Sequence, residues 1–387
     1  LRDWVFSRQR YWGEPIPLVE CKKCGFVPVP EEELPVVLPE VDNFIPPASG
    51  ETVLSSVKEW VNTTCPNCRG EAKRETDIMP QWAGSSWYFL RYVDPKNDSE
   101  FASREKLDYW MPVDWYNGGM EHTTLHLLYS RFWHKFLYDE GLLSCSEPYK
   151  KRTSHGMILG SDGEKMSKSR GNVVNPDDIV NEFGADTLRV YEMFMGVFDQ
   201  VSFWDQNGVI GVYKFLNRVW NLMEKVDRET EINEENLRII HKTVKKVGER
   251  IEKMKYNTAV SEIMTYTNHL TSMKKIPVKM MEILTVLLYP FAPHIACEIW
   301  EKVVDDKKLV AEQPWPSYDE NLAKDTVITI SIQVNGKLRG TIEVEPGVDK
   351  DTLVGMALEM ERVKKFTGDK TIRKTIYVPD RLLNIVV

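Results

Sequence analysis

Four of the six cysteines stand in two close pairs, and this spacing limits how the amino-terminal part of the chain can fold. Cys21 and Cys24 enclose two residues, as do Cys65 and Cys68. Pairs of this kind, in a chain that we expect to be intracellular, are typical of zinc ligands rather than of disulfides. Residues 21–76 are rich in proline, glutamate and glycine and lack sustained periodicity. We therefore expect a loop-rich module around a closed, structural Zn²⁺, with reduced, unliganded thiols as the alternative.

The composition is that of a folded chain, and the 387 residues correspond to two or three domains. Hydrophobic residues make up 42% and charged residues 28%, which excludes general disorder. The longest nearly apolar stretch, residues 283–292, is far shorter than the ~20 residues of a membrane helix, so we expect a cytoplasmic protein with no membrane partner. The net charge of −8 argues against general coating of nucleic acid but allows local basic surfaces. The first residue is Leu1 rather than methionine, which predicts a fragment.

Residues 1–20 and 77–205 show the pattern of a parallel α/β domain. An apolar run over residues 113–117 ends at Gly118-Gly119, and a helical pattern follows from Thr123 to Glu140. A strand, a glycine turn and a helix in this order are typical of doubly wound α/β folds. We therefore expect these two segments to form one domain, interrupted by the cysteine module.

A helical region follows. Asn175 can cap a helix that begins with Pro176 at its first position. From Gly208 to Lys302 the apolar positions recur every three or four residues, which predicts a helical bundle within a domain of residues 206–318.

The tail, residues 326–387, has a different pattern. Isoleucine and valine alternate with polar residues over 328–334, and Asn335-Gly336 then turns the chain into residues 337–344, which predicts a β-hairpin. A helix over about residues 349–366 and two short strands should follow. The tail is therefore expected to be a small, separate α+β domain.

The loop from Lys165 to Ser169 carries the most specific chemistry in the sequence. Two lysines and two serines stand between flanking glycines. Lysine supplies a point charge with three donors and serine a short donor, so such a loop can bind phosphate oxygens. It would stabilise the charge that develops on pyrophosphate as it is displaced from a nucleotide. The alternative is an exposed basic loop without a ligand.

This loop, Lys165-Met166-Ser167-Lys168-Ser169, resembles the second signature motif of the class I aminoacyl-tRNA synthetases. The flanking segments are similar to the strand before and the helix after that motif, over residues 155–159, 176–180 and 184–189. Residues 7–17 resemble the element after the editing insertion in the leucine, isoleucine and valine branch. Three further segments narrow the resemblance to the leucine-specific members of bacterial type: residues 79–88, 118–122 and 333–340.

The resemblance covers the whole chain and implies its fold and function. The expected fold is α/β, the C-terminal half of a Rossmann-like catalytic domain, followed by an anticodon-binding-type helical bundle and a small α+β domain. The expected activity is the ATP-dependent attachment of leucine to its tRNA through leucyl-adenylate, with Mg²⁺ beside ATP.

None of the seven histidines forms the first signature motif of the family. The resemblance therefore implies that the first half of the nucleotide fold and the editing domain belong to a missing amino-terminal half, in the same chain or in a separate subunit. We expect that the isolated chain neither activates leucine nor edits.

The resemblance also assigns residues. Lys165 and Lys168 are the implied catalytic residues, Glu121 would accept hydrogen bonds from the ribose, and Met157 with Ile158 would pack near adenine. The implied ATP-binding residues are Lys165, Ser167, Lys168, Glu121, Gly119, Met157 and Ile158. The implied leucine pocket consists of Trp82, Ser85, Tyr88, His122 and His126. The implied contacts to tRNA(Leu) are Lys337, Arg339, Lys364 and Lys365.

The sequence departs from the family pattern at two places, and several of the assigned roles have alternatives. His155 stands where many relatives have glutamine, and the short loop over residues 160–164 lacks a leucine-specific insertion. His126 could be a buried core histidine, Trp82 could serve packing only, and the basic tail could be an ordinary soluble surface. The whole chain could be a non-catalytic tRNA-binding subunit or fragment, or part of an isoleucyl- or valyl-tRNA synthetase.

Overall fold

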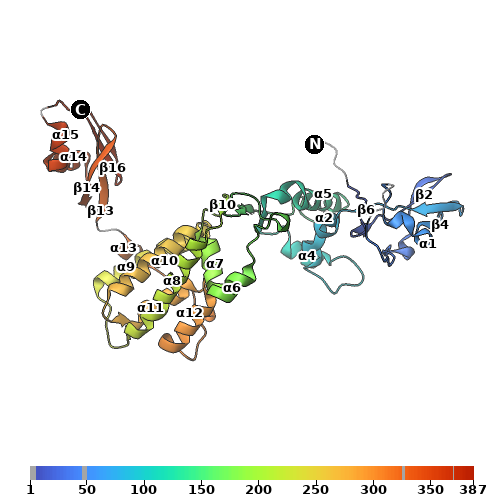
Figure 1. The fold of residues 1–387 in the computed structure, drawn as a ribbon, viewed down its shortest axis with the longest axis horizontal. Helices are drawn as coiled ribbons and strands as arrows, with labels where there is room; N and C mark the ends of the chain where they lie inside the picture. The colour runs from blue at the N-terminus through green and yellow to red at the C-terminus, as the bar shows by residue number, and fades with distance from the viewer. Residues whose placement is uncertain (1–5, 46–49, 325–326, 369) are drawn as a thin grey trace. The chain divides into compact units, whose positions relative to one another are not determined.

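The computed structural model describes residues 6–45, 50–324, 327–368 and 370–387. They form two compact units, coloured along the chain in Figure 1. The first runs to Met157 and includes Asp199–Val201, and the second comprises Ile158–Phe198 and Ser202–Val387. The fold is mixed α/β with a helical region and a C-terminal sheet, as expected. No helix among the described residues combines the length and apolar character needed to cross a bilayer.

The cysteine pairs lie in a small antiparallel sheet of the first unit, with strand order β3-β2-β5-β4. Its core contains few aliphatic side chains, chiefly Val19, Val27 and Ala72, packed around Cys21 and Cys65. So small a core contributes little hydrophobic stabilisation. The elements of this module are β2 (Leu18–Cys21), β3 (Gly25–Pro28), a 3-10 helix (Glu31–Glu33), another (Leu54–Ser56), α1 (Lys58–Val61), β4 (Asn62–Thr64) and β5 (Glu71–Arg74).

The α/β part of the first unit confirms the predicted order of strand, glycines and helix, with two corrections. The glycine pair lies inside strand β7 (Tyr116–Gly119), and a 3-10 helix (Met120–Thr124) precedes α5 (His126–Asp139). The expected helix start at Thr123 was wrong because Leu125, at φ −116° and ψ −107°, interrupts the helical backbone. The remaining elements are β1 (Glu14–Pro15), β6 (Ile78–Met79), α2 (Gln81–Gly84), a 3-10 helix (Ser85–Trp87), α3 (Tyr88–Arg91), α4 (Arg104–Trp110) and β8 (Arg152–His155), which pairs with β7 in parallel.

The second unit contains the predicted helices. Asn175 accepts a hydrogen bond from the backbone N–H of Asp177, and Pro176 occupies the first helical position, as the sequence indicated. Buried aliphatic and aromatic side chains, among them Phe215 and Tyr266, form one core through this region. Its helices are α6 (Pro176–Phe183), α7 (Ala185–Phe194), α8 (Gln206–Asn221), α9 (Glu234–Glu252), α10 (Tyr256–Ser272), α11 (Val278–Leu288), α12 (Pro293–Ile299), a π-helix (Trp300–Val304) and α13 (Glu320–Ala323).

Several short elements complete the second unit. Two pairs of very short parallel strands join distant parts of the chain, and the other elements are single 3-10 turns. They are β9 (Ile158–Leu159) with β10 (Ser202–Phe203), β11 (Val226–Asp227) with β12 (Ile276–Pro277), and 3-10 helices at Lys168–Arg170, Leu222–Lys225 and Val310–Glu312.

Helix α7 is joined to the corner between α11 and α12 by two side chains. Buried Asp186 accepts hydrogen bonds from His294 Nδ1 (2.7 Å) and from the backbone N–H of Ile295 (2.7 Å) at the start of α12. One turn further along α7, Arg189 donates to the carbonyls of Pro290 (3.0 Å) and Phe291 (3.3 Å). The segment that follows the lysine loop is thus fixed to the helical region.

The tail confirms the predicted hairpin and corrects the predicted helix. Strands β13 (Ile328–Val334) and β14 (Lys337–Val344) pair around Asn335 and Gly336, both at positive φ. The helix is split into α14 (Lys350–Glu359) and α15 (Glu361–Thr367), because Met360 is extended at ψ 126°. The break lets both helices pack on one face of the sheet (Figure 1). Two further strands, β15 (Lys374–Val378) and β16 (Leu382–Val386), complete the sheet order β14-β13-β16-β15.

Replacing Asp186 with alanine should lower the free energy of unfolding of the second unit. The substitution removes a buried carboxylate from two strong donors, and charged hydrogen bonds of this kind contribute about 2 to 3 kcal/mol. Chemical denaturation followed by circular dichroism measures the change. Glu182→Ala, which removes an exposed carboxylate from α6, is the matched control, and an equal effect of both substitutions would contradict the assigned role of Asp186.

Candidate functional site

A hydrogen-bonded network in the first unit brings together three of the five predicted leucine-pocket residues. His126, the first residue of α5, contacts Ser85 Oγ through Nδ1 (3.1 Å) and Tyr116 Oη through Nε2 (2.6 Å). The Tyr116 hydroxyl also meets Tyr88 Oη at 2.8 Å. The network forms because β7 ends only a few residues before α5 begins, so Tyr116 and His126 face each other. His126 is buried, and both of its ring nitrogens have a partner.

The surroundings of this network favour the uncharged forms of His126 and Tyr116. Burial, with a further contribution from nearby His122, lowers the pKa of His126. Burial and the hydrogen bond with Tyr88 raise the pKa of Tyr116, and burial raises that of Tyr149, which stacks on Tyr116 at 4.1 Å, to about 12. A site of this kind can orient an uncharged or apolar group without transferring a proton to it.

Sequence reasoning missed Tyr116, although it links the other members of the network. Its position in the strand that leads to Gly118-Gly119 is the signal that could have identified it. Tyr149 was missed as well, and no local pattern distinguishes it from a core tyrosine. Its hydroxyl donates to buried Ser130 at 2.7 Å.

The other two predicted pocket residues, Trp82 and His122, contact each other edge to face at 4.9 Å between ring centroids. The ring of His122 lies 6.4 Å from that of His126. His122 Nδ1 is buried and makes no hydrogen bond within the described part of the chain. It is therefore a polar atom that a bound ligand could satisfy.

Glu121 lies beside His122, with its carboxylate 4.0 Å from His122 Nε2, and its side chain is 52% exposed. The carboxylate folds back over Gly119, where a Cβ atom would collide with it. Glycine is therefore required at residue 119 for this position of Glu121. An exposed carboxylate at the end of a parallel strand is well placed to accept two hydrogen bonds from a diol.

The lysine loop, in the second unit, is ordered by its own polar groups. Asn172 accepts from the backbone N–H of Ser167 (2.8 Å) and donates to Asp162 (3.0 Å). Leu159 pairs with Lys165, and Ser167 meets Ser169 through their hydroxyls at 2.7 Å. These hydrogen bonds therefore order the loop without a bound ligand. Asn172 and Asp162 were not among the predicted site residues.

Both lysine side chains of the loop are free to contact a ligand. Lys165 and Lys168 are exposed, and neither ammonium forms an ion pair with any residue that the structure describes. The loop's own carboxylate, Glu164, is instead paired with Arg170 at 2.7 Å. Two uncompensated positive charges on an ordered loop favour the binding of an anion.

The predicted strand over residues 155–159 is interrupted. Strand β8 ends at His155 and β9 begins at Ile158. Between them, the backbone of Gln200 passes so close to Gly156 that a Cβ atom at residue 156 would overlap its carbonyl. Met157 and Ile158, the predicted adenine contacts, thus belong to different units, and Ile158 packs against the helical core.

The four paired cysteines converge. Their Sγ atoms all lie within 4.8 Å of one another, and Cys21 and Cys68 are 3.6 Å apart. Backbone N–H groups of Cys24 and Lys23 lower the pKa of Cys21 to about 7, whereas the neighbouring Cys68 thiol and burial raise that of Cys24 to about 12. All four thiols could ionise together in this space only beside a compensating cation. The donor set fits a tetrahedral, thiolate-bound metal ion, for which a bond length of about 2.3 Å gives similar sulfur spacings.

The predicted tRNA contacts lie on β14 and α15 of the tail. Arg339 stacks its guanidinium on Phe366, 3.3 Å from the ring centroid. Lys337 is exposed on β14, and Lys364 and Lys365 are exposed in the last turn of α15. The stacking of Arg339 on Phe366 thus joins the two elements that carry these basic residues, β14 and α15.

The pH dependence of stability should show that His126 is neutral. Because its pKa is lowered in the folded chain, the unfolded chain binds more protons there as the pH falls below about 6.5, and stability decreases. His126→Gln should reduce this dependence, as measured by denaturant unfolding between neutral and mildly acidic pH. An NMR titration in which the His126 ring protonates at its ordinary pKa would contradict the assignment.

Comparison with known proteins identifies the family to which the chain belongs. Residues 1–202 match the family tRNA synthetases class I (I, L, M and V), and residues 233–354 match the anticodon-binding domain of tRNA ligase. A leucine–tRNA ligase of Alkaliphilus oremlandii is 56% identical over all 387 residues, which are 48% of its own length. The chain thus spans about half the length of this curated relative.

A solved structure is similar over the whole chain. It is the agnB2 LeuRS of Agrobacterium radiobacter K84 in a ternary complex with tRNA and LeuAMS, with a TM-score of 0.75 and 35% identity, over 100% of this chain and 52% of that one. The matched family extends over more than half of the present sequence. The chain therefore belongs to the class I tRNA synthetases of the isoleucine, leucine, methionine and valine group.

Proposed function

We propose that this chain provides the pyrophosphate-binding part of a leucine-activating centre, which attaches leucine to tRNA(Leu) through leucyl-adenylate. The observation that carries the proposal is the ordered loop with two unpaired lysines, in a chain 56% identical to a leucine–tRNA ligase. The other half of the enzyme, in the same chain or in a separate one, is the partner that completes the centre. We place this function in the cytoplasm.

In the activation step, the carboxylate of leucine attacks the α-phosphorus of ATP and pyrophosphate leaves. The carboxylate is already ionised near neutral pH, so no general base is needed. Lys165 and Lys168 neutralise the charge that grows on the leaving group, and Ser167 adds a hydroxyl donor. Because Asn172 already orders the loop, little reorganisation is required at that moment. When bound with ATP, Mg²⁺ would supply further positive charge to the phosphates.

The two sides of the substrate meet different groups of the first unit. Glu121, kept over Gly119, accepts hydrogen bonds from the ribose hydroxyls. The leucine side chain contacts the neutral network instead, which presents no charge that the ligand would have to desolvate. The proposed leucine contacts are Trp82, Ser85, Tyr88, His122 and His126.

The remaining contacts involve adenine and tRNA. Met157 and Ile158 provide apolar surface for adenine. The basic surface of the tail, with Lys337, Arg339, Lys364 and Lys365, meets phosphates of tRNA(Leu), and Lys and Arg side chains supply most contacts of this kind.

Removing one loop lysine should separate the catalytic proposal from a merely tRNA-binding one. Lys168→Ala, in a protein that combines this chain with the remaining half of the synthetase, should slow leucine-dependent ATP–pyrophosphate exchange by about 100-fold or more. Lys150→Ala, which removes an exposed ion pair with Asp114, is the control and should leave the rate unchanged. An unaltered rate in Lys168→Ala, or exchange that depends on isoleucine or valine rather than leucine, would exclude the proposal.

We further propose that the four cysteines hold one structural Zn²⁺. The set contains only protein thiolates, so the site is closed, and the ion would stabilise a module whose own core is small. Elemental analysis should find about one zinc per chain. Cys68→Ser should lose the ion and unfold the module, as seen in proteolysis within residues 21–76. Cys297→Ser, at an exposed cysteine, should keep the ion. A metal-free preparation with this module intact would refute the assignment.

A further inference from the structure

We propose that Tyr149, which lies just before β8, is a positioning residue for leucine recognition. It holds Tyr116 and helix α5 in the arrangement in which the Tyr116 hydroxyl donates to His126. The inference rests on the proposed function, because it takes the His126 network as the leucine site. Tyr149 is not one of the proposed leucine contacts, and it acts through Tyr116 and Ser130, both of which it contacts directly.

The direction of the hydrogen bonds in the network follows from its last acceptor. Ser85 Oγ donates to the backbone carbonyl of Trp82 at 3.3 Å, and a carbonyl can only accept. Since Ser85 uses its own hydrogen there, it accepts from His126 Nδ1–H, and His126 Nε2 then accepts from the Tyr116 hydroxyl. Tyr116 Oη in turn accepts from the hydroxyl of Tyr88. The Tyr116 hydroxyl therefore selects the Nδ1-protonated tautomer of His126.

The ring of Tyr149 fixes the orientation of Tyr116. The two rings are stacked, with their centroids 4.1 Å apart and their planes inclined by 18°. The backbone brings them together, because Val113, just before β7, pairs with Tyr149 in parallel. Phe89 packs against the Tyr149 ring, with 5.5 Å between centroids. A stacked and supported neighbour resists rotation of the Tyr116 ring, and the position of the Tyr116 hydroxyl depends on that rotation.

The hydroxyl of Tyr149 fixes the helix that carries His126. It donates to Ser130 Oγ at 2.7 Å, and Ser130 donates onward to the carbonyl of Leu127 at 3.1 Å. Ser130 is completely buried and follows His126 by one turn of α5, so both side chains lie on the same face of the helix. A shift of α5 along its axis would break this hydrogen bond inside the protein. Tyr149 thus contacts both the donor of the Tyr116–His126 hydrogen bond and the helix of its acceptor.

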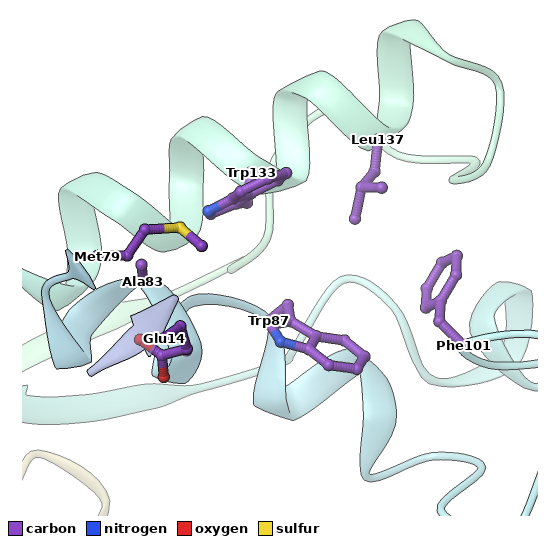
Figure 2. A pocket seen from close by; sticks show the side chains of 8 residues that line it. Glu14, Met79, Ala83, Trp87, Phe101, Trp133 and Leu137 are labelled. Atoms are coloured by element: carbon purple, nitrogen blue, oxygen red, sulfur yellow. The ribbon is translucent and has the colours of Figure 1, made fainter. Parts of the chain in front are cut away.

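Another face of α5 borders an apolar pocket. Figure 2 shows Trp133 and Leu137 on one helix, facing a space of about 350 Å³. The pocket shares no lining residue with the His126 network. The open space gives α5 little support on this side, so the polar face with His126 and Ser130 determines where the helix lies. Leu137 therefore offers a control position on the same helix.

The tautomer of His126 tests the positioning role directly. Heteronuclear NMR of the 387-residue chain with isotope-labelled histidine distinguishes the two tautomers at slightly alkaline pH, and the signal lost in His126→Gln assigns the residue. We expect the Nδ1-protonated form in the unaltered chain and in Tyr149→Phe, which keeps the ring. Tyr149→Leu fills the space without an aromatic ring and should give a mixture of both tautomers.

Leucine-dependent ATP–pyrophosphate exchange tests the consequence, in a protein that combines this chain with the remaining half of the synthetase. Tyr149→Leu should raise the KM for leucine by about tenfold and change kcat and the KM for ATP by less than about twofold, because only leucine binding uses the network. Tyr149→Phe and Ser130→Ala should each raise the leucine KM by about threefold. The double variant should raise it no further, because both substitutions remove the same hydrogen bond. Leu137→Ala should leave the leucine KM unchanged.

Circular dichroism confirms that each variant is folded. A tautomer unchanged in Tyr149→Leu, an unaltered chain in which His126 is protonated at Nε2, or an equal rise of the leucine KM in Tyr149→Leu and Leu137→Ala would overturn the inference. Additive effects of Tyr149→Phe and Ser130→Ala, which keep the rings in place, would also overturn it. Absence of leucine-dependent exchange without any substitution would instead refute the proposed function, and with it the leucine role of Tyr149. The two failures are distinguishable, because the NMR comparison does not involve leucine.

Discussion

A buried hydrogen-bonding group must find a partner, and this requirement organises the structure at each of its main sites. His126 is buried at the start of a helix and uses both ring nitrogens, which fixes Ser85 and Tyr116 around it. Asp186 is buried on α7 and is satisfied by the first residues of α12. In both cases one side chain joins segments far apart in the sequence, and a shift of either segment would leave a polar atom unpaired.

The hydrogen bonding of buried groups also distinguishes two kinds of site: those whose polar groups are satisfied within the chain and those with an unsatisfied polar group. The His126 network and the Asp186 contacts are saturated within the chain. By contrast, His122 Nδ1 in the first unit is buried without a partner among the described residues. The saturated groups position the backbone, and an unsatisfied group such as this one indicates where a ligand is expected. The lysine loop combines both properties, since Asn172 satisfies its backbone while the ammonium groups stay free to meet an anion.

Much of this organisation could be predicted from local sequence. The Asn335-Gly336 turn and the Asn175-Pro176 helix start depend on backbone preferences of single residues, and the structure confirms both. The cysteine spacing indicated correctly that four thiols meet. The errors have a different origin. The helix breaks at Met360, where α14 and α15 pack into one core, and the strand is interrupted at Gly156, which the distant Gln200 approaches closely. Tyr116 likewise joins the network through contacts with residues from other segments of the chain. Contacts between segments that are distant in sequence leave no periodic pattern in the local sequence.

The stacking of Arg339 on Phe366 has a consequence for the tail surface as a whole. A free arginine side chain loses about 2 kcal/mol of conformational entropy when it is immobilised. Here the ring already restricts the guanidinium, so part of that loss occurs during folding rather than during association. Its exposed neighbour Lys337 has no such restriction. Arg339 and Lys337 carry the same charge on one strand, but Arg339 has already lost part of its conformational entropy on folding. A partner that contacts both residues therefore gains more binding free energy from the arginine.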